Sequence, residues 1–261
     1  MKKILGAFFI LALNLISNAQ TISNSLNGYF STSKKDALYT SIHFDGKGHA
    51  LINDGFSGEY FQLDDMVYVF PDKSVFIFKL EKDKLKGVSN WVEKQTYKLS
   101  QVPMNDDYIR EFKTYKIDPD LLYQYYIQNF NKGTDEISFS VFEDGEAYLK
   151  KMEELCQKNL TSACGALFGI KLLDASGGLD AFLSEEKMVV KENKNLENIA
   201  TKMIDLGDFR GYALLGSYYA LIGNLDKAKA LYNEGSEKGD GDSAMALFAL
   251  ELEEASNELE E

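Results

Sequence analysis

Residues 211–235, GYALLGSYYALIGNLDKAKALYNEG, decide the fold of the C-terminal half. Small residues recur in this stretch at helical spacing beside Leu and Tyr, a pattern that predicts closely packed helices. The sequence Ile222-Gly223-Asn224 interrupts the pattern, and Gly and Asn favour the left-handed backbone found just past a helix end. The stretch therefore predicts two helices joined by a tight turn, and its glycines indicate helix contacts instead of a ligand-binding loop.

The same pattern returns further along the chain. Gly207-Asp208 leads into the first of these helices, and Gly239-Asp240 follows at a spacing of 239 minus 207, or 32, residues. A period in the thirties that carries paired helices is typical of an α-solenoid. We expect two or three helix pairs, about six helices in all, between Glu146 and Ala255.

Several residues of this region resemble a known repeat family. The spacing of six residues resembles that of the tetratricopeptide repeat, and the Gly-Asp links resemble those of its Sel1-like relatives. The six are Leu215, Gly216, Tyr219, Gly223, Ala228 and Tyr232. The resemblance implies that Gly216 and Ala228 face each other across a helix pair, with both tyrosines packed nearby. These positions are architectural, so the resemblance implies a binding scaffold and transfers no catalytic residue.

The N-terminus indicates export from the cytoplasm. Lys2 and Lys3 precede an apolar run that ends in the small residues Ser17-Asn18-Ala19. This order is typical of a secretory signal peptide, and the run is too short for a membrane span. We predict a signal peptide over 1–19 and a periplasmic or extracellular location; the alternative is a retained N-terminal anchor.

The only two cysteines, Cys156 and Cys164, would meet an oxidising compartment after export. An even pair in an exported chain predicts a disulfide, and the absence of C-x-x-C spacing argues against a redox-active pair. The segment also resembles cysteine-bearing Sel1-like repeats, which implies a disulfide that ties one helix to the next. Closing so short a loop contributes about 2–3 kcal/mol in the chain-entropy account. Metal binding by these thiols with His43 and His49 is disfavoured, because no ligand cluster has metal-type spacing.

Residues 20–100 alternate between apolar and polar side chains with a period close to two, which predicts antiparallel strands. Turn sequences such as Asp45-Gly46-Lys47-Gly48 separate them. We expect six to eight strands, arranged as a small barrel or a sandwich. The stretch that begins Leu26-Asn27-Gly28-Tyr29 loosely resembles a lipocalin-like barrel, which transfers no ligand residue. Trp91 and the many Tyr and Phe are expected to be core, with a pocket lining as the alternative.

Residues 101–142 form a connector, in which Pro103 interrupts the strand pattern. Asp118 can cap a helix whose first turn holds Pro119. Aromatic residues occupy more than one side of that helix, so we expect it to be buried between the two modules. A peptide-binding aromatic patch is the alternative. Residues 143–261 complete the chain as the helical repeat with an acidic tail, whose last helix is expected to cap the stack with an outer face that meets water.

Charge and motifs narrow the function. The formal charge is 28 minus 41, or −13, which repels nucleic acid and anionic membranes. No G-x-S-x-G nucleophile elbow occurs, and no cofactor or metal motif is present. We expect an α+β protein that is exported, non-catalytic and bound to a protein or peptide partner in the cell envelope, without nucleic acid and without stable membrane insertion. The alternatives are a small-molecule or lipid carrier with its site in the β module and, less favoured, a cell-envelope hydrolase.

Overall fold

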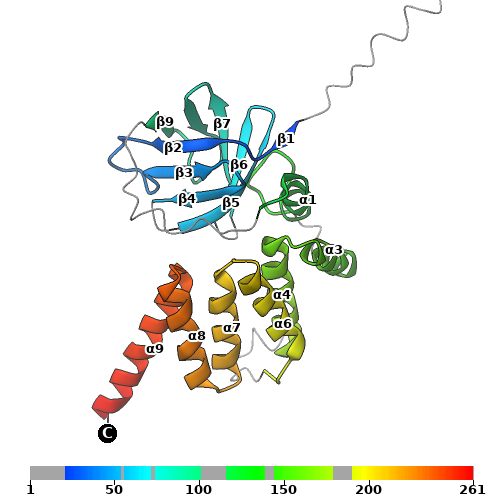
Figure 1. Cartoon of the computed structure of the whole chain (residues 1–261), viewed down its shortest axis with the longest axis vertical. Coiled ribbons are helices and arrows are strands. Elements are labelled where there is room, and N and C mark those ends of the chain that lie inside the picture. The colour runs from blue at the N-terminus through cyan, green and yellow to red at the C-terminus, as the bar shows by residue number, and fades with distance from the viewer. Residues whose placement is uncertain are drawn as a thin grey trace, which may run out of the picture.

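The computed structural model describes residues 21–53, 56–71, 74–100, 116–138, 144–178 and 190–260. A closed antiparallel β-barrel comes first and a group of helices follows it (Figure 1). The predicted α+β arrangement of two modules is therefore confirmed, with a barrel and not a sandwich as the N-terminal part. The predicted signal peptide, 1–19, and the start of the predicted connector, including Pro103, lie outside the described residues.

The barrel is an up-and-down meander. Strands β2 to β9 each pair with their neighbours in sequence, and β2 pairs with β9 to close the ring. A short additional strand, β1, pairs with the end of β5 at Gln62 and Leu63. The strands are β1 (Ile22–Ser23), β2 (Asn27–Ser31), β3 (Ser41–Asp45), β4 (His49–Ile52), β5 (Phe56–Leu63), β6 (Met66–Phe70), β7 (Phe76–Glu81), β8 (Lys84–Gly87) and β9 (Thr96–Ser100).

Alternation along each strand separates two apolar surfaces of the barrel. One set of buried side chains fills the interior, and its largest members are Phe30, Phe44, Tyr60, Phe76, Phe78 and Tyr97. The other set lies on the outer face of β5 to β7 and belongs to the same core as the helices. A strand that is apolar on both faces needs cover on its outer side, and the first helix supplies it.

The alternating stretch from Leu85 to Leu99 predicts a single strand, but the structure divides it in two. The sequence from Leu85 to Leu99 forms β8 and β9, separated by a turn that carries Trp91. Ser89 Oγ accepts a hydrogen bond from Ile77 N at 2.9 Å, which holds the start of this turn against β7. Trp91 is 53% exposed, so the expectation that it belongs to the core is wrong.

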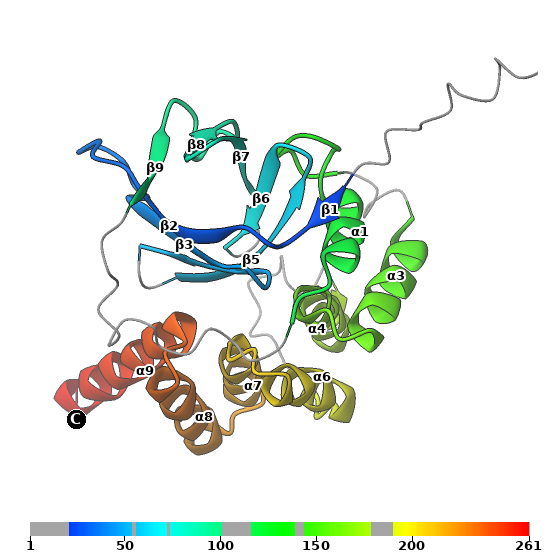
Figure 2. The same ribbon diagram turned by 45° about the horizontal axis from the view of Figure 1, so that its top comes forward.

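The helical part consists of a connector helix and a stack of antiparallel helices. Adjacent members of the stack pack along their lengths, and α6 bridges α4 and α7 (Figure 2). The described helices are α1 (Pro119–Asn129), α3 (Gly145–Gln157), α4 (Thr161–Ala175), α6 (Lys194–Asp205), α7 (Arg210–Leu221), α8 (Leu225–Glu237) and α9 (Gly241–Glu260). Within the described part of the chain, no helix is both long and apolar enough to cross a membrane.

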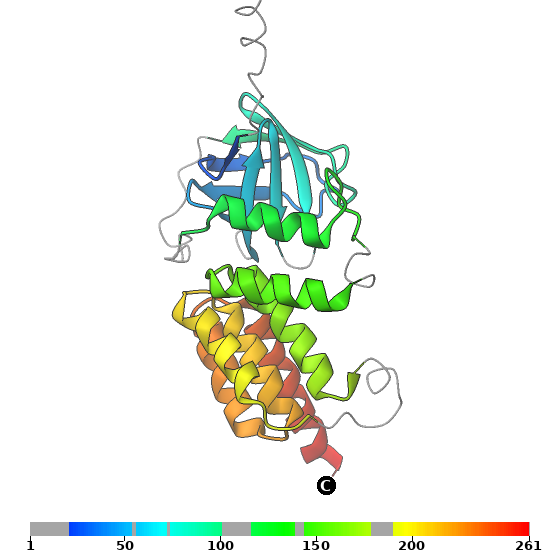
Figure 3. The same ribbon diagram turned by 90° about the vertical axis from the view of Figure 1, so that its right-hand side faces the viewer.

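The connector helix α1 lies across the outer face of the barrel, between the barrel and the stack (Figure 3). The Asp118 side chain accepts a hydrogen bond from Asp120 N, and Pro119 occupies the first turn, as predicted. Tyr126 is fully buried against Phe61 and Tyr68 of the barrel. The aromatic side chains of this helix therefore join the modules, and the peptide-binding alternative for Tyr126 does not fit its burial.

Glycine ends three successive helices in the same way. Gly207, Gly223 and Gly239 have φ values of 81°, 84° and 86°, which place each of them in the left-handed region just past a helix. Only glycine adopts this conformation without a steric cost. These tight reversals keep α6 to α9 antiparallel and bring the starts of α7 and α9 to the side that faces the barrel, where the start of α4 also lies (Figure 2).

Candidate functional site

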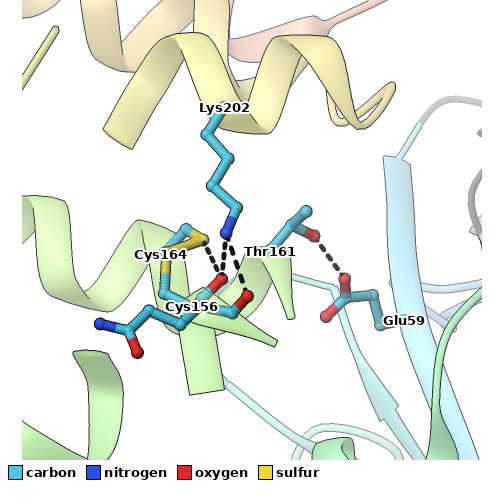
Figure 4. Close-up of a disulfide and its surroundings, with 6 residues drawn as sticks. Glu59, Cys156, Thr161, Cys164 and Lys202 are labelled. Atoms are coloured by element: carbon cyan, nitrogen blue, oxygen red, sulfur yellow. Dashed lines mark hydrogen bonds between the residues drawn. A yellow bond between two sulfur atoms is a disulfide. The ribbon is translucent and has the colours of Figure 1, made fainter. Parts of the chain in front are cut away.

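A buried carboxylate of the barrel meets the start of a stack helix. Glu59 of β5 is 1% exposed, and its Oε1 accepts a hydrogen bond from Thr161 Oγ1 at 2.8 Å. Its other oxygen accepts from Ser162 Oγ. Both donors lie in the first turn of α4, where the helix dipole favours a negative charge. Glu59 thereby fixes one module against the other (Figure 4).

Arg210 extends this contact to the next part of the stack. It lies at the start of α7 and its guanidinium donates to both carboxylate oxygens of Asp208, from Nε to Oδ1 at 3.0 Å and from Nη2 to Oδ2 at 2.6 Å. The same Nη2 lies 3.8 Å from Glu59 Oε1. Two buried carboxyl groups therefore lie beside one guanidinium at the junction between the modules.

A carboxylate accepts hydrogen bonds near the start of each of the helices α4, α7 and α9, but it comes from a different part of the chain at α4. Asp208 accepts from Arg210 N at 3.2 Å near the start of α7, and Asp240 accepts from Ser243 N at 2.9 Å at the start of α9. At α4 the capping residue is Leu160, which offers no side-chain hydrogen bond. Glu59 of the barrel provides the carboxylate that Leu160 lacks.

A cleft of about 340 Å³ opens beside this contact, between the barrel and the start of α9. Two large apolar side chains on its barrel side face solvent, since Phe56 is 59% exposed and Trp91 is 53% exposed. Arg210 and Asp242 line its stack side. Among the described residues, the lining is formed by Tyr39, Ile52, Phe56, Ser57, Pro71, Ser74, Trp91, Arg210, Gly239, Asp240, Gly241 and Asp242.

The chemistry of the cleft favours a ligand with apolar and cationic groups. Trp91 and Phe56 offer exposed ring surface, and an aromatic face attracts cations such as ammonium and guanidinium. Asp240 and Asp242 add carboxylates, and Arg210, the cationic side chain among the described lining residues, pairs with Asp208. A Lys or Arg side chain beside an apolar residue of a peptide matches this arrangement.

The residues singled out from the repeat lie in the packed interior of the stack, not in the cleft. Leu215, Tyr219, Ala228 and Tyr232 are buried, and Gly223 forms the turn between α7 and α8. Around Gly216 the arrangement differs from the expected one. The three atoms nearest to a Cβ placed at Gly216 all belong to Tyr232, so the ring of Tyr232 takes the place expected for Ala228.

Replacement of Gly216 by Ala tests this contact. The added Cβ would lie 2.5 Å from Tyr232 Cε1, so we expect a loss of about 1–3 kcal/mol in the free energy of unfolding. Gly169→Ala is the matched control, because it is also inside a helix and no atom lies within 4 Å of its Cβ position. There we expect a gain of about 0.5–1 kcal/mol. Urea unfolding followed by circular dichroism measures the free energy of unfolding of both variants. If both substitutions changed it in the same direction, the close contact between Gly216 and Tyr232 would be contradicted.

The predicted cysteine pair lies at disulfide-bond distance. Cys156 on α3 and Cys164 on α4 have Cα atoms 4.7 Å apart, on either side of the turn that joins the two helices (Figure 4). Lys202 of α6 donates to Cys156 O at 2.7 Å and to Gln157 O at 3.4 Å. A cation at the carbonyl end of a helix is stabilising, so Lys202 joins α6 to the end of α3.

The barrel interior is packed with its own side chains. Ile42, Phe44 and Tyr60 are fully buried, and the rings of Phe44 and Tyr60 meet edge to face with their centroids 4.8 Å apart. Tyr60 Oη donates within the barrel to Leu26 O and Asn24 O. These contacts favour core packing for the aromatic residues of the barrel over the lining of a ligand pocket.

Asp45 and His49 form a buried pair at one end of the barrel. Asp45 accepts from His49 Nδ1 at 2.8 Å and from His49 N at 2.9 Å. Burial opposes ionisation of Asp45, but these bonds outweigh it and leave the pKa of the Asp45 carboxyl below its usual value. The pair holds the turn between β3 and β4. Among the described residues, no group of three or more His, Cys, Asp or Glu side chains is arranged to bind a metal ion.

Sequence reasoning missed the cleft. The pocket alternative for Trp91 and the Tyr and Phe residues of the β module covers Tyr39, Phe56 and Trp91 of the lining, but the sequence carries no signal for Glu59 or Arg210. Comparison with protein families, with curated proteins and with solved structures found no match.

Proposed function

We propose that this chain is an exported, non-catalytic interaction protein that binds a peptide segment of a cell-envelope partner in the cleft between its two modules. The exposed pair Phe56 and Trp91, set beside the carboxylates of the α9 start, carries the proposal. Large aromatic side chains are enriched among the residues that dominate the energy of protein interfaces, so two exposed ones in one cleft lining suit a binding site.

The helical part provides the scaffold in this proposal. Its antiparallel helices, its glycine turns and the spacing of its Gly-Asp links support a stack of the Sel1 or tetratricopeptide kind. The cysteine pair at disulfide-bond distance supports an oxidising compartment, outside the cytoplasm, as the place of action. The predicted signal peptide over 1–19 agrees with that location.

The carboxylates in the described lining of the cleft define the partner segment. It carries a Lys or Arg side chain that approaches Asp242 and an aromatic face, next to an apolar side chain that contacts Phe56 and Trp91. Because the chain as a whole has a charge of −13, a basic segment is also drawn toward it over longer distances.

Selection from a random displayed-peptide library on the full chain tests the proposal. We expect selected peptides to be enriched in Lys or Arg beside apolar residues. Trp91→Ala and Phe56→Ala should each weaken their binding about tenfold in calorimetry, which corresponds to about 1.4 kcal/mol. Both residues are more than half exposed, so the fold should persist.

Leu225→Ala is the matched control for these variants. Leu225 is 52% exposed, but it lies at the start of α8 and outside the cleft lining. Its replacement should leave the affinity unchanged. Peptides that bind the two cleft variants as tightly as the original chain would refute the cleft as the binding site.

A further inference from the structure

The last helix of the stack exposes an apolar stripe. Met245, Phe248 and Leu252 of α9 are 73%, 62% and 55% exposed. At 100° per residue, these three positions fall within an arc of about 60° on one side of the helix. We call them the α9 stripe. Figure 2 shows α9 at the open end of the stack, beyond α8.

The opposite side of α9 is already used for packing. Ala246, Leu247 and Leu250 pack against the core of the stack, and the buried Ser243 lies against Gly235 of α8. The helix is therefore apolar on two sides, as an internal helix of a solenoid is. A terminal repeat normally shows water a polar outer face. The outer face of α9 is exposed, as expected of a capping helix, but along the stripe this face is apolar and not polar.

The charge beside the stripe selects its partner. Glu251 and Glu253 are exposed and lie about 60–80° from the stripe on its two sides. The sequence of the helix contains no Lys, Arg or His, while its carboxylates are Asp242, Glu251, Glu253, Glu254, Glu258 and Glu260. Pairing with a second copy would bring two acidic helices together, and an anionic membrane would repel the same carboxylates. A basic surface is the complementary one.

We propose that the α9 stripe docks an amphipathic helix of a partner protein, with Lys or Arg on both sides of its apolar face. Such a helix would pack on α9 as α9 packs on α8, so that the partner adds the next layer to the stack. The apolar face would cover Met245, Phe248 and Leu252, while the basic flanks would meet Glu251 and Glu253. This surface is separate from the cleft, because the described cleft lining includes Gly241 and Asp242 of α9 but no residue of the stripe.

Binding of two synthetic peptides to the full chain tests this inference. The first is an amphipathic helix of about 18 residues, or five turns, made of Leu and Lys; the second has Glu in place of Lys. We expect the first to bind the original chain and the second not to bind. The double substitution Phe248→Gln and Leu252→Gln should weaken binding of the first peptide at least tenfold.

Two control variants distinguish binding at the stripe from binding at other exposed apolar side chains and from binding in the cleft. Leu225→Gln removes another exposed apolar side chain, on α8, and should leave the affinity unchanged. Trp91→Ala, which tests the cleft, should also leave it unchanged. Loss of binding in either control to the same extent as in the double variant would overturn the proposal.

The other occupants are tested on the same variants. Sedimentation of the original chain should show a monomer in the absence of peptide, and uncharged lipid vesicles should not bind it. Self-association that the double substitution abolishes would assign the stripe to a second copy and overturn the proposal. Vesicle binding that it abolishes would assign the stripe to a membrane, with the same consequence.

Discussion

Tyr126→Ala is expected to lower the free energy of unfolding by about 3–5 kcal/mol, the usual cost of truncating a large buried aromatic residue. Tyr126 is fully buried, and its ring stacks on Phe130 with centroids 5.8 Å apart. It also meets Phe61, Tyr68 and Phe70 of the barrel, so the truncation removes contacts on both sides of the interface.

The hydroxyl of Tyr126 adds a smaller contribution. It donates to Thr134 O at 2.9 Å and accepts from Gly133 N at 2.7 Å, which fixes the loop after α1. Burial, with Tyr68 nearby, raises the pKa of Tyr126 above its usual value, so the hydroxyl keeps its proton and remains a donor. Tyr126→Phe should therefore cost about 1 kcal/mol, well below the cost of the Ala variant.

Denaturation by urea, followed by tryptophan fluorescence, measures these effects at the barrel, since Trp91 is the only tryptophan. Ile127→Ala is the control on the next position of the same helix, where the side chain is 39% exposed and a change within about 0.5 kcal/mol is expected. If the Tyr126 and Ile127 variants were equally stable, α1 would not hold the barrel as described.

Glu59→Ala is expected to cost about 2–4 kcal/mol and to loosen the junction between the modules. The change removes the hydrogen bonds from Thr161 and Ser162 to a buried carboxylate, and bonds to charged groups contribute about 1.5–3 kcal/mol each. The loss stays below the sum of the two, because Arg210 keeps its pairing with Asp208. Glu59→Gln preserves the shape and should cost less.

The predicted signature is a loss of cooperativity. In the original chain, fluorescence of the barrel and circular dichroism of the helices should report one transition in urea; in the Glu59→Ala variant the two transitions should separate. Glu93→Ala is the matched control, because Glu93 is a carboxylate of the barrel with a side chain that is 52% exposed. Coincident transitions with unchanged midpoints in the Glu59 variant would show that this carboxylate does not join the modules.

Much of the fold is encoded locally and could be predicted. Alternation along the strands and turn sequences such as Asp45-Gly46 specify the hairpins, and a meander needs only neighbouring strands to pair. Gly223 ends α7, and Asp118 caps α1, through contacts within a few residues. The cysteine pair, eight residues apart, was also within reach of sequence reasoning.

The candidate site depends on contacts between distant segments, which one sequence does not reveal. Glu59 and Thr161 are separated by 102 residues, and no local pattern distinguishes Glu59 from the other carboxylates of this acidic chain. Trp91 lies among residues that alternate like a strand, and only the surrounding fold shows that it is in a turn. Similarly, the spacing of Met245, Phe248 and Leu252 is visible in the sequence, but the side of α9 left uncovered is not.

The contact between Glu59 and the start of α4 also constrains the order in which the chain folds. The barrel is built from hairpins between neighbouring strands, which form quickly because the loops to be closed are short. It also leaves the ribosome first, and domains fold largely in that order. The start of α4 then docks on a barrel that already presents Glu59. The helical part is therefore completed by an earlier folded piece of its own chain, and a fragment that begins after the barrel would lack the contact that anchors its first helix pair.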